Sequence, residues 1–443
     1  MKISFHTLGC KLNQAETEEL KKDLVQRGFS VVLFGAHEDV AVVRACGVTV
    51  DASQTTREMI RRAKRRGAYV IAVGCLENKD LPEIDFVARG NEEVVSHCEA
   101  RRGAVGCVLA SLGREASAMP LRRHKALRTH PTARLRNDRT RTLIKIQTGC
   151  NFNCAYCIIP SFRGRTRSVP SEAVIKKIKE AEKDGYKEAV LTGVNICQYK
   201  DSSHPPFVPP SGSGGDLAEL LKKILRETKI ERIRLGSLDP RLISEKLIKL
   251  FLPPFYSPLK KGGQNRLMPH WHLSLQSGSD TMLKRMRRGY NAKQYLGIVQ
   301  KLRQANPLFS FTTDIIVGFP GETEKEFTET CAFVKKMSAQ DGPAFGGGFA
   351  KIHVFPFSPR PGTAAAKMPN QVQDKIKTER VKKLLKISKA EAKKFAAKFT
   401  GKTRPVLFEQ KKSGYFAGYT PEFVRVRVKS KQTLQNKIKE IKI

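Results

Sequence analysis

The sequence predicts an α/β protein with three parts: a Rossmann-like amino-terminal α/β domain, an open (β/α)6 partial barrel and a small carboxy-terminal antiparallel β-barrel. Three observations predict it. Apolar runs and helix-like segments alternate in the first 112 residues. Six strand-like runs then recur at intervals of about forty residues, each with one helix-like segment, as in repeated βα units. Finally, β-leaning segments bounded by glycine and proline follow a lysine-rich helix.

The first part, residues 1–112, contains apolar runs of the kind that form buried parallel strands. Helix-like stretches accompany them. We therefore expect a small parallel α/β domain. Its predicted strands are 31–34, 40–43 and 69–73, and its predicted helices are Ala15–Arg27 and Ser53–Arg65.

The middle part, residues 139–370, carries the βα rhythm, which predicts an open six-stranded relative of the parallel barrel with its chemistry at the carboxyl ends of the strands. Asp216 is a candidate N-cap, and Thr323 with Glu326 forms a candidate capping box. The strand-like runs begin near Leu143, Glu188, Arg232, Trp271, Phe311 and Phe349, and the clearest helices are Ser171–Asp184, Asp216–Thr228 and Thr323–Met337.

Two stretches rich in proline, glycine and serine or lysine interrupt the rhythm, at 200–215 and 252–269. Tolerated surface insertions are the default interpretation. The first follows a strand, which predicts a position on the catalytic face, where it could touch substrate. The second follows a helix, which predicts the opposite face and no role.

The last part, residues 371–443, begins with a lysine-rich amphipathic helix over 371–398. The β-leaning segments 404–409, 414–419 and 423–428 follow it. Glycine and proline bound these segments, which predicts a small antiparallel β module.

The chain is strongly basic, with a formal net charge of +39 from 81 Lys+Arg against 42 Asp+Glu. The charge is concentrated at 61–66, 122–141 and 375–404, and residues 113–138 are predicted to be a basic linker. A generally basic surface is one explanation, but clustering favours a polyanionic partner such as nucleic acid. The sequence shows neither a transmembrane stretch nor a signal-peptide pattern, so we expect no membrane contact and a cytoplasmic location.

The most informative stretch places Cys150, Cys154 and Cys157 on one loop directly after the strand that begins near Leu143. Three thiolates cap three irons of a 4Fe-4S cube and leave the fourth iron open for the amino and carboxylate groups of S-adenosylmethionine (SAM). The alternatives are a zinc site without its fourth ligand, or incidental cysteines. Zinc prefers four ligands in paired Cys-x2-Cys spacing, and no partner pair exists.

With this loop the sequence resembles the radical SAM superfamily, and within it the methylthiotransferases, over nearly the whole chain. The motifs that carry the resemblance occur in order and at the predicted strand ends. They are Thr7-Leu-Gly-Cys-Lys-Leu-Asn-Gln14, Arg163-Gly-Arg165 with Arg167-Ser168, Leu191-Thr-Gly-Val-Asn195, His272-Leu-Ser-Leu-Gln-Ser-Gly278, Asp314-Ile-Ile-Val-Gly-Phe-Pro-Gly-Glu-Thr323 and His353-Val-Phe-Pro-Phe-Ser358.

The positions of several motif residues at the ends of predicted strands suggest which residues hold SAM. Ordinary strand-end packing is the alternative for each. Gly193 and Asn195 are expected at its amino group, and Ser274 and Gln276 at its ribose or carboxylate. Gly318, without a side chain, would let the adenine approach. Further candidates are Tyr156 for adenine stacking or bonding, and Arg163, Arg165 and Arg167 for the SAM carboxylate or RNA phosphate, if they are not simply a solvated basic loop.

A second group of cysteines, Cys10, Cys46 and Cys75, follows three predicted strands of the amino-terminal domain. Positions just past parallel strands share one edge of a sheet. Spacing alone leaves structural thiols equally open, but the resemblance implies a second 4Fe-4S cluster that carries the transferred sulfur. The family usually shows Asn-Thr-Cys where this chain has Arg44-Ala45-Cys46, which changes the neighbours of that ligand. The other thiols, expected to be non-ligands, are Cys98, Cys107, Cys197 and Cys331.

The resemblance also implies the reaction. One SAM yields a 5′-deoxyadenosyl radical that removes hydrogen from an unactivated carbon, a second SAM supplies methyl, and sulfur from the amino-terminal cluster forms the new C–S bond. No side-chain acid or base is expected, because the two 4Fe-4S clusters and SAM carry the chemistry. A reductant such as flavodoxin or ferredoxin is the expected protein partner, and no particular oligomeric state is predicted.

The motifs look most like the group that modifies C2 of N6-threonylcarbamoyladenosine at tRNA position 37. The carboxy-terminal module resembles an RNA-binding TRAM barrel, in which Phe416 and Tyr419 would stack on bases unless they form an ordinary core. Isopentenyladenosine in tRNA and a ribosomal-protein aspartate are alternative substrates. Two other classes remain open: a radical SAM enzyme whose second cluster only transfers electrons, and a tRNA-binding protein with inactive clusters.

Overall fold

The computed structural model describes residues 1–76, 81–112, 140–201, 217–253, 266–339 and 348–443. The chain divides into two compact units, Met1–Asn137 and Asp138–Ile443. The predicted linker 113–138 and most of the predicted insertions 200–215 and 252–269 lie outside the described residues.

The end of the second predicted insertion is an exception. Leu267 is 2% exposed and forms a parallel bridge with Ile233 of the neighbouring strand. Because this backbone continues the sheet, residues 266–269 belong to the barrel rather than to a surface insertion.

The amino-terminal unit is a parallel five-stranded sheet in the order β2-β1-β3-β4-β5. The central strands are apolar and buried, as predicted, whereas β2 is a short edge strand, and Leu33 just after it is 83% exposed. The elements are β1 (Lys2–Thr7), α1 (Lys11–Gln26), β2 (Ser30–Val32), β3 (Val40–Ala45), α2 (Val50–Lys64), β4 (Tyr69–Gly74), β5 (Phe86–Ala88) and α3 (Asn91–Leu112).

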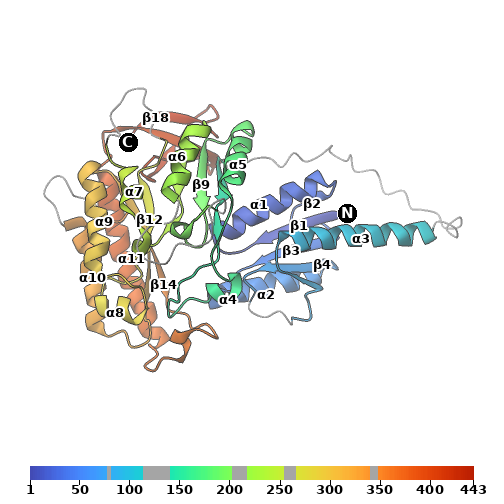
Figure 1. The fold of residues 1–443 in the computed structure, drawn as a ribbon, viewed down its shortest axis with the longest axis horizontal. Helices are drawn as coiled ribbons and strands as arrows, with labels where there is room; N and C mark the ends of the chain where they lie inside the picture. Colours follow the sequence, from blue (N-terminus) through green and yellow to red (C-terminus); the bar gives the residue numbers. More distant parts are fainter. Residues whose placement is uncertain (77–80, 113–139, 202–216, 254–265, 340–347) are drawn as a thin grey trace. The chain divides into compact units, whose positions relative to one another are not determined.

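The second unit contains two parallel sheets, β6-β9-β10 and β11-β12-β13-β14. β10 and β11 are consecutive in the chain and separated only by Gly236, so the strands follow one another as an open six-stranded half-barrel (Figure 1). This confirms the predicted architecture. The strands are β6 (Arg141–Lys145), β9 (Glu188–Thr192), β10 (Arg232–Leu235), β11 (Ser237–Leu238), β12 (His270–Leu273), β13 (Ser310–Val317) and β14 (Lys351–Pro356), with a small antiparallel pair, β7 (Gln147–Thr148) and β8 (Arg167–Ser168).

Helices cover the outer side of this half-barrel and form one apolar core with the strands (Figure 1). The predicted capping box at the start of α10 is present: Glu326 N donates to Thr323 Oγ1 at 3.2 Å and Thr323 N donates to Glu326 Oε2 at 2.9 Å. Asp216, the other predicted cap, lies outside the described residues. The helices are α4 (Ile159–Arg163), α5 (Ser171–Lys183), α6 (Leu217–Glu227), α7 (Glu245–Lys249), α8 (Asp280–Arg285), α9 (Ala292–Ala305) and α10 (Glu324–Ala339).

The long helix α11 (Asp374–Ala397) packs against β14 and α10 and leads into an antiparallel sheet in the order β17-β16-β15-β18. The predicted β module is therefore present, with one strand that the sequence pattern missed. Its strands are β15 (Thr403–Lys412), β16 (Tyr415–Tyr419), β17 (Arg425–Val428) and β18 (Ile438–Lys442).

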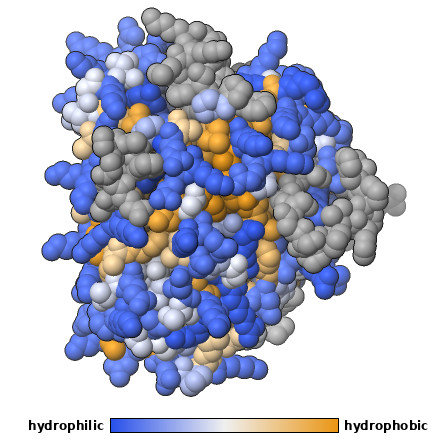
Figure 2. All heavy atoms as spheres, turned by 60° about the vertical axis from the view of Figure 1, so that its left-hand side comes forward, coloured by the Kyte–Doolittle hydropathy of each residue, from blue (hydrophilic) through white to orange (hydrophobic). Residues whose placement is uncertain are grey.

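The face drawn in Figure 2 is covered mainly by hydrophilic residues, with apolar residues visible in a band near its middle. Among the described residues, no helix is both long enough and apolar enough to span a membrane.

Candidate active site

The cysteine loop of the barrel unit lies at the carboxyl edge of the parallel strands, between β7 and α4. Backbone hydrogen bonds fix it on three sides. Cys150 N donates to Gly164 O at 3.1 Å, Ala155 N donates to Met286 O at 3.1 Å, and Ala365 N donates to Ala155 O at 2.8 Å. The loop is thus held by segments that are distant in the sequence, which gives the three thiols a defined setting.

Donors point at the sulfur atoms of this loop. Phe152 N lies 3.5 Å from Cys150 Sγ, and two guanidinium groups reach Cys154 Sγ: Arg288 Nη1 at 3.3 Å and Arg241 Nη2 at 3.6 Å. Hydrogen bonds and positive charge favour a thiolate over a thiol. In an iron–sulfur site, the same groups tune the cluster potential.

Sequence analysis missed the two arginines and the carboxylate between them. Asp239 follows β11 and is 6% exposed, and its Oδ2 accepts from Arg241 at 2.7 Å and from Arg288 at 3.0 Å. Burial opposes ionisation of Asp239, but Arg241 and Arg288 outweigh it and lower its pKa. The position of Asp239 at a strand end was the available signal. Two cations against one anion leave a net positive charge beside Cys154.

Burial disfavours the charged form of these thiols. It raises the pKa of Cys157 to about 12 and also raises the pKa of Cys150, which a bond from Phe152 N partly offsets. Without metal the two thiols therefore remain protonated at neutral pH. Binding of iron must displace these protons, so cluster assembly is coupled to deprotonation.

Two of the predicted SAM-binding residues, Gly193 and Asn195, are joined to the base of the cysteine loop by Gln147. Asn195 N donates to Gln147 Oε1 at 3.0 Å, and Gln147 Nε2 donates to Gly149 O at 2.6 Å. A Cβ on Gly193 would approach Gln147 Oε1 to 2.7 Å. The predicted strand end therefore does lie beside the loop.

Ser274 and Gln276 follow β12 at the same edge. Tyr290 Oη donates to Ser274 O at 2.9 Å, and Arg288 Nε lies 3.3 Å from Tyr290 Oη, which links this strand end to the arginine at Cys154. Gln276 is 8% exposed with φ of +69°, and its backbone bridges to Asp314 and Ile316. The side chain of Gln276 therefore starts from an unusual backbone conformation.

Tyr156 is also tied to this network, since Arg288 Nη1 lies 3.3 Å from its hydroxyl. Burial raises the pKa of Tyr156 well above its usual value, so the phenol stays protonated. Gly318 follows β13 with φ of +70°, and a Cβ there would lie 2.4 Å from Lys377 Cγ. The space in front of Gly318 is thus filled by Lys377 of α11, and adenine would reach Gly318 only by displacing that side chain.

Polar side chains also occupy one face of the middle strands. His272 Nε2 lies 3.1 Å from Asp314 Oδ2, and its Nδ1 lies 3.0 Å from Thr312 Oγ1. Trp271, on the opposite face of β12, is fully buried in the apolar core. Because side chains alternate along a strand, the face that carries His272 is the inner, polar face of the half-barrel.

In the amino-terminal unit, Cys10, Cys46 and Cys75 follow the adjacent parallel strands β1, β3 and β4. Cys10 is the N-cap of α1 and is exposed, whereas Cys46 and Cys75 are 8% and 3% exposed. The sheet thus brings the three cysteines to one carboxyl edge, as their positions in the sequence predict.

The backbone beside these cysteines is closely packed. Asn13 Nδ2 donates to Leu8 O at 2.7 Å and to Ala45 O at 3.0 Å, which joins the loop before Cys10 to the end of β3. Gly9 has φ of +90°, and a Cβ on it would approach Cys46 Sγ to 2.7 Å. Cys46 and Cys75 line one small cavity together with Thr56.

The departure from the family pattern at Arg44 has a structural explanation. Arg44 is 3% exposed, and its guanidinium bonds Glu16 Oε2 at 3.1 Å, Thr17 Oγ1 at 3.0 Å and Asn91 Oδ1. It therefore ties β3 to α1 and α3 through a buried ion pair. The Cys46 amide is instead bonded to Thr56 Oγ1 at 3.3 Å.

The donors fit iron–sulfur clusters. Each set is three cysteines and no other ligand type, which suits soft metal centres and leaves one cluster iron free. In the described part of the chain, which includes all six cysteines, no three His, Cys, Asp or Glu side chains are placed to ligate a single ion. In a cube each thiolate binds a different iron. The remaining described thiols, Cys98, Cys197 and Cys331, are buried. Cys197 lies next to the barrel set, since Asp239 N donates to its Sγ at 3.4 Å.

The predicted RNA-binding residues have different surroundings. Arg165 and Arg167 are exposed near the cysteine loop, and Arg163 is partly buried with Nη1 3.2 Å from Thr148 Oγ1. The prediction that Phe416 stacks on bases is corrected: its ring is 5% exposed and packs in the apolar core of the carboxy-terminal sheet.

Tyr419 is also engaged within the protein. Its ring stacks on Phe423 with 4.7 Å between centroids, and the Arg141 guanidinium lies 4.8 Å from its centroid. The segment around Tyr419 holds the carboxy-terminal sheet on the barrel, because Arg232 donates to Tyr419 O at 2.9 Å and Arg234 donates to Pro421 O at 3.0 Å. The ring is therefore part of an intramolecular interface.

Comparison with known proteins agrees with this division into units. The model of the Radical SAM superfamily matches residues 144–334, and that of the uncharacterized protein family UPF0004 matches residues 2–96. In fold, the chain is similar to the radical S-adenosylmethionine methyltransferase TsrM from Kitasatospora setae with cobalamin and a 4Fe-4S cluster bound. The TM-score is 0.50 at 13% identity, covering 80% of this chain and 74% of that one. The barrel unit is therefore that of a radical SAM enzyme.

The similarity to curated relatives extends through both units. The chain is 34% identical over 416 residues to the threonylcarbamoyladenosine tRNA methylthiotransferase MtaB of Aquifex aeolicus, covering 91% of each chain. It is 35% identical over 436 residues to that of Thermotoga maritima, covering 96% of this chain and 90% of the relative. The chain belongs to the threonylcarbamoyladenosine tRNA methylthiotransferase family. It is a transferase whose cofactors are two 4Fe-4S clusters and SAM.

Proposed function

We propose that the protein inserts a methylthio group at C2 of N6-threonylcarbamoyladenosine at position 37 of tRNA. The observation that carries this proposal is the presence of both cysteine sets at strand ends, in a chain that aligns with the named methylthiotransferases over almost its whole length. The cluster on Cys150, Cys154 and Cys157 would supply SAM cleavage, and the cluster on Cys10, Cys46 and Cys75 would supply the sulfur.

The chain's own residues have the tasks of binding and positioning. Arg241 and Arg288 offset negative charge at Cys154, and the strand ends at Asn195 and Ser274 form the edge where SAM would lie. The polar inner face around His272 offers hydrogen-bonding groups to a polar substrate. Enclosing the reaction there would keep water and side reactions away from a radical.

Basic side chains offer a surface for the tRNA backbone. Four lysines of α11 that follow a 4-3-4 spacing are exposed and lie on one helix face, about 16 Å long at ~1.5 Å per residue. Within the described residues none of the four forms an ion pair. They are Lys382, Lys386, Lys389 and Lys393. Because tRNA is used in translation in the cytoplasm, we place the enzyme there, with a low-potential reductant such as flavodoxin or ferredoxin as its electron donor.

The test is product analysis with anaerobically reconstituted enzyme, dithionite, SAM and tRNA that carries N6-threonylcarbamoyladenosine. The expected result is a nucleoside heavier by one methylthio group in place of hydrogen, formed together with 5′-deoxyadenosine. Cys46→Ala should cleave SAM but form no methylthio product, whereas Cys98→Ala, which removes a buried thiol outside both sets, should retain both activities.

Unmodified tRNA and tRNA with isopentenyladenosine serve as competing substrates. Product on the isopentenyl tRNA alone would overturn the assigned base but not the reaction. If SAM cleavage occurs and no methylthio nucleoside forms on any of these tRNAs, the proposed reaction is wrong and an electron-transfer role for the second cluster becomes the better account.

A further inference from the structure

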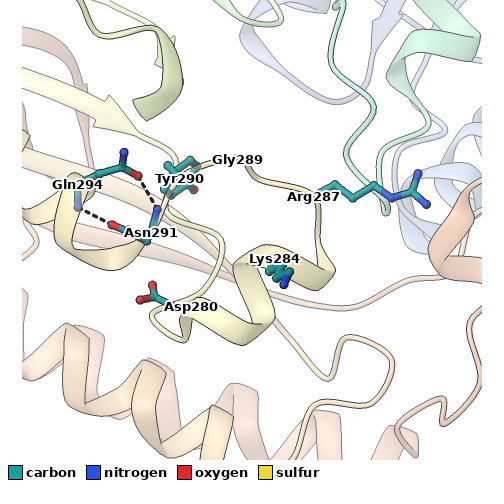
Figure 3. Close-up of a pocket in the computed structure, with 7 residues that line it drawn as sticks. All are labelled: Asp280, Lys284, Arg287, Gly289, Tyr290, Asn291 and Gln294. Carbon is teal, nitrogen blue, oxygen red and sulfur yellow. Dashed lines mark hydrogen bonds between the residues drawn. The ribbon is translucent and has the colours of Figure 1, made fainter.

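A pocket of about 550 Å³ lies on the barrel unit beside the cysteine loop. It is formed by α8, by the turn that follows α8, and by the first turn of α9 (Figure 3). Two cationic side chains, Lys284 and Arg287, line it and are exposed. The remaining lining residues are Asp280, Gly289, Tyr290, Asn291 and Gln294.

The polar groups of the pocket other than the two cations are already engaged. Asp280 Oδ1 accepts from Ala292 N at 2.7 Å. Asn291 and Gln294 bond each other's backbone in the capping box of α9, at 2.8 and 3.0 Å (Figure 3). Lys284 and Arg287, by contrast, form no ion pair with any described residue. The pocket therefore offers two uncommitted cations against one carboxylate that caps a helix.

The turn that forms this pocket is bonded to the cysteine loop. Met286 O accepts from Ala155 N at 3.1 Å, and Arg288 Nη1 reaches Cys154 Sγ at 3.3 Å. Arg287 has φ of +58°, and the two consecutive arginines lie in different surroundings. Arg287 is exposed at the pocket, whereas Arg288 is 4% exposed at the cluster site. A ligand in the pocket is thus separated from the cluster site by a single turn of chain.

We propose that this pocket binds backbone phosphate of the RNA substrate next to the nucleotide that is modified, with Lys284 and Arg287 as the phosphate-binding residues. The inference rests on the proposed function, because it assumes an RNA substrate. An enzyme that must bring one base to a radical source needs contacts that fix the neighbouring backbone, and phosphate contacts supply position without reading sequence. Charge complementarity between two unpaired cations and the phosphodiester backbone favours this occupant.

The test compares Lys284→Ala/Arg287→Ala with a matched variant, Lys176→Ala/Lys179→Ala, which removes two exposed lysines from the outer face of α5. The probe is an anticodon stem–loop RNA with N6-threonylcarbamoyladenosine at position 37. Iron content and the midpoint of thermal unfolding establish that each variant is folded. Binding is measured by fluorescence anisotropy over a series of salt concentrations.

The pocket variant should bind the RNA at least about tenfold more weakly. The slope of log Kd against log salt should fall by about 1.4, since each lost contact to single-stranded backbone removes ~0.7. The affinity of the α5 variant should stay within about twofold of that of the wild type.

Equal affinity and equal slope for the wild type and a folded pocket variant would overturn the inference. A wild-type protein that binds no RNA would overturn it together with the proposed function. If the wild type methylthiolates the RNA and the pocket variant does so at the same rate, the inference is wrong but the proposed function stands.

Discussion

At the scale of single residues, buried side chains support the cysteines of the barrel unit. Arg288 is buried, and its guanidinium group forms hydrogen bonds with Cys154 Sγ, Tyr156 Oη and Asp239. A guanidinium donor at a ligating sulfur withdraws electron density from the cluster and stabilises its reduced form.

Arg288→Gln should therefore lower the reduction potential of the SAM-binding cluster. SAM cleavage should slow by about tenfold or more, the usual range for groups that support metal ligands. Redox titration followed by electron paramagnetic resonance measures the potential. Arg285→Gln, which breaks a partly exposed ion pair between α8 and Glu326 of α10, is the control and should leave the potential unchanged. Equal potentials for both variants would contradict this role of Arg288.

Gly9 provides a similar test in the amino-terminal unit. Gly9→Ala should displace Cys46, because the added methyl would lie 2.7 Å from its Sγ. We expect loss of the iron held by that unit, with the other cluster retained. Gly67→Ala is the matched control, since Gly67 also has positive φ, of +79°, but has nothing within 4 Å of the added carbon. If both variants keep all their iron, Gly9 does not shape the cluster site.

Sequence patterns were sufficient to place Cys10, Cys46 and Cys75 just past adjacent strands, which end at one edge of the amino-terminal sheet. They were not sufficient for Asp239 and Arg288, whose importance comes from contacts between residues 49 positions apart. They also misplaced Phe416, since an aromatic residue on a short strand has the same local pattern whether its ring faces solvent or core.

At the scale of elements, the carboxy-terminal sheet is attached to the barrel through a buried charge network at the amino ends of the strands. Glu188, the first residue of β9, accepts hydrogen bonds from Arg234 at 2.8 and 3.2 Å. Arg232 and Arg234 also donate to backbone carbonyl groups of the carboxy-terminal segment. Burial opposes ionisation of Glu188, but Arg234, Arg141 and Arg232 outweigh it and lower its pKa to about 2.

A carboxylate whose pKa is lowered on folding stabilises the fold above its unfolded pKa, and this contribution is lost as pH falls through the folded value. For Glu188 the interval is from 4.5 down to about 2, which corresponds to roughly 3 kcal/mol at ~1.36 kcal/mol per pH unit. Glu188→Gln should destabilise the cluster-free protein by about this amount near neutral pH and weaken its pH dependence below 4.5.

Urea unfolding at several pH values tests this prediction. Glu172→Gln, which removes a solvent-screened ion pair with Lys223 on the outer helices, should cost far less stability than Glu188→Gln. An equally small cost for Glu188→Gln would show that the network does not hold the two elements together.

The order of the main elements was predictable because the longer buried strands and most helices carry a clear local period. Helix starts were harder to predict. Helix α1 begins at Lys11 and not at Ala15, because its N-cap is Cys10, whose side chain forms no capping hydrogen bond and so gives no signal in the sequence. The strand β18 was missed because its five residues, Ile-Lys-Glu-Ile-Lys, do not alternate between apolar and polar, and because its partner β15 lies over thirty residues earlier.

At the scale of the whole molecule, the net charge of +39 suits a polyanionic substrate. Replacement of Lys382, Lys386, Lys389 and Lys393 by Gln should weaken tRNA binding and lower the slope of log Kd against log salt by about 3, at ~0.7–0.9 per lost contact. Filter binding between 50 and 200 mM salt measures both quantities.

A control with the same loss of charge replaces Lys176, Lys179, Lys246 and Lys249, four exposed lysines on α5 and α7. If the control lowers the slope as much as the α11 variant, the charge acts through the general field of the molecule. The exposed face of α11 would then have no specific role in binding.

The central claim is that each unit holds one 4Fe-4S cluster through three cysteines, since methylthio transfer requires both. The most direct test is to count iron and sulfide in anaerobically reconstituted wild type and in the Cys150→Ala/Cys154→Ala/Cys157→Ala variant. The account predicts about eight irons in the wild type and about four in the variant, with one 4Fe-4S signal remaining. About four irons in the wild type and none in the variant would contradict it, and would make Cys10, Cys46 and Cys75 structural thiols.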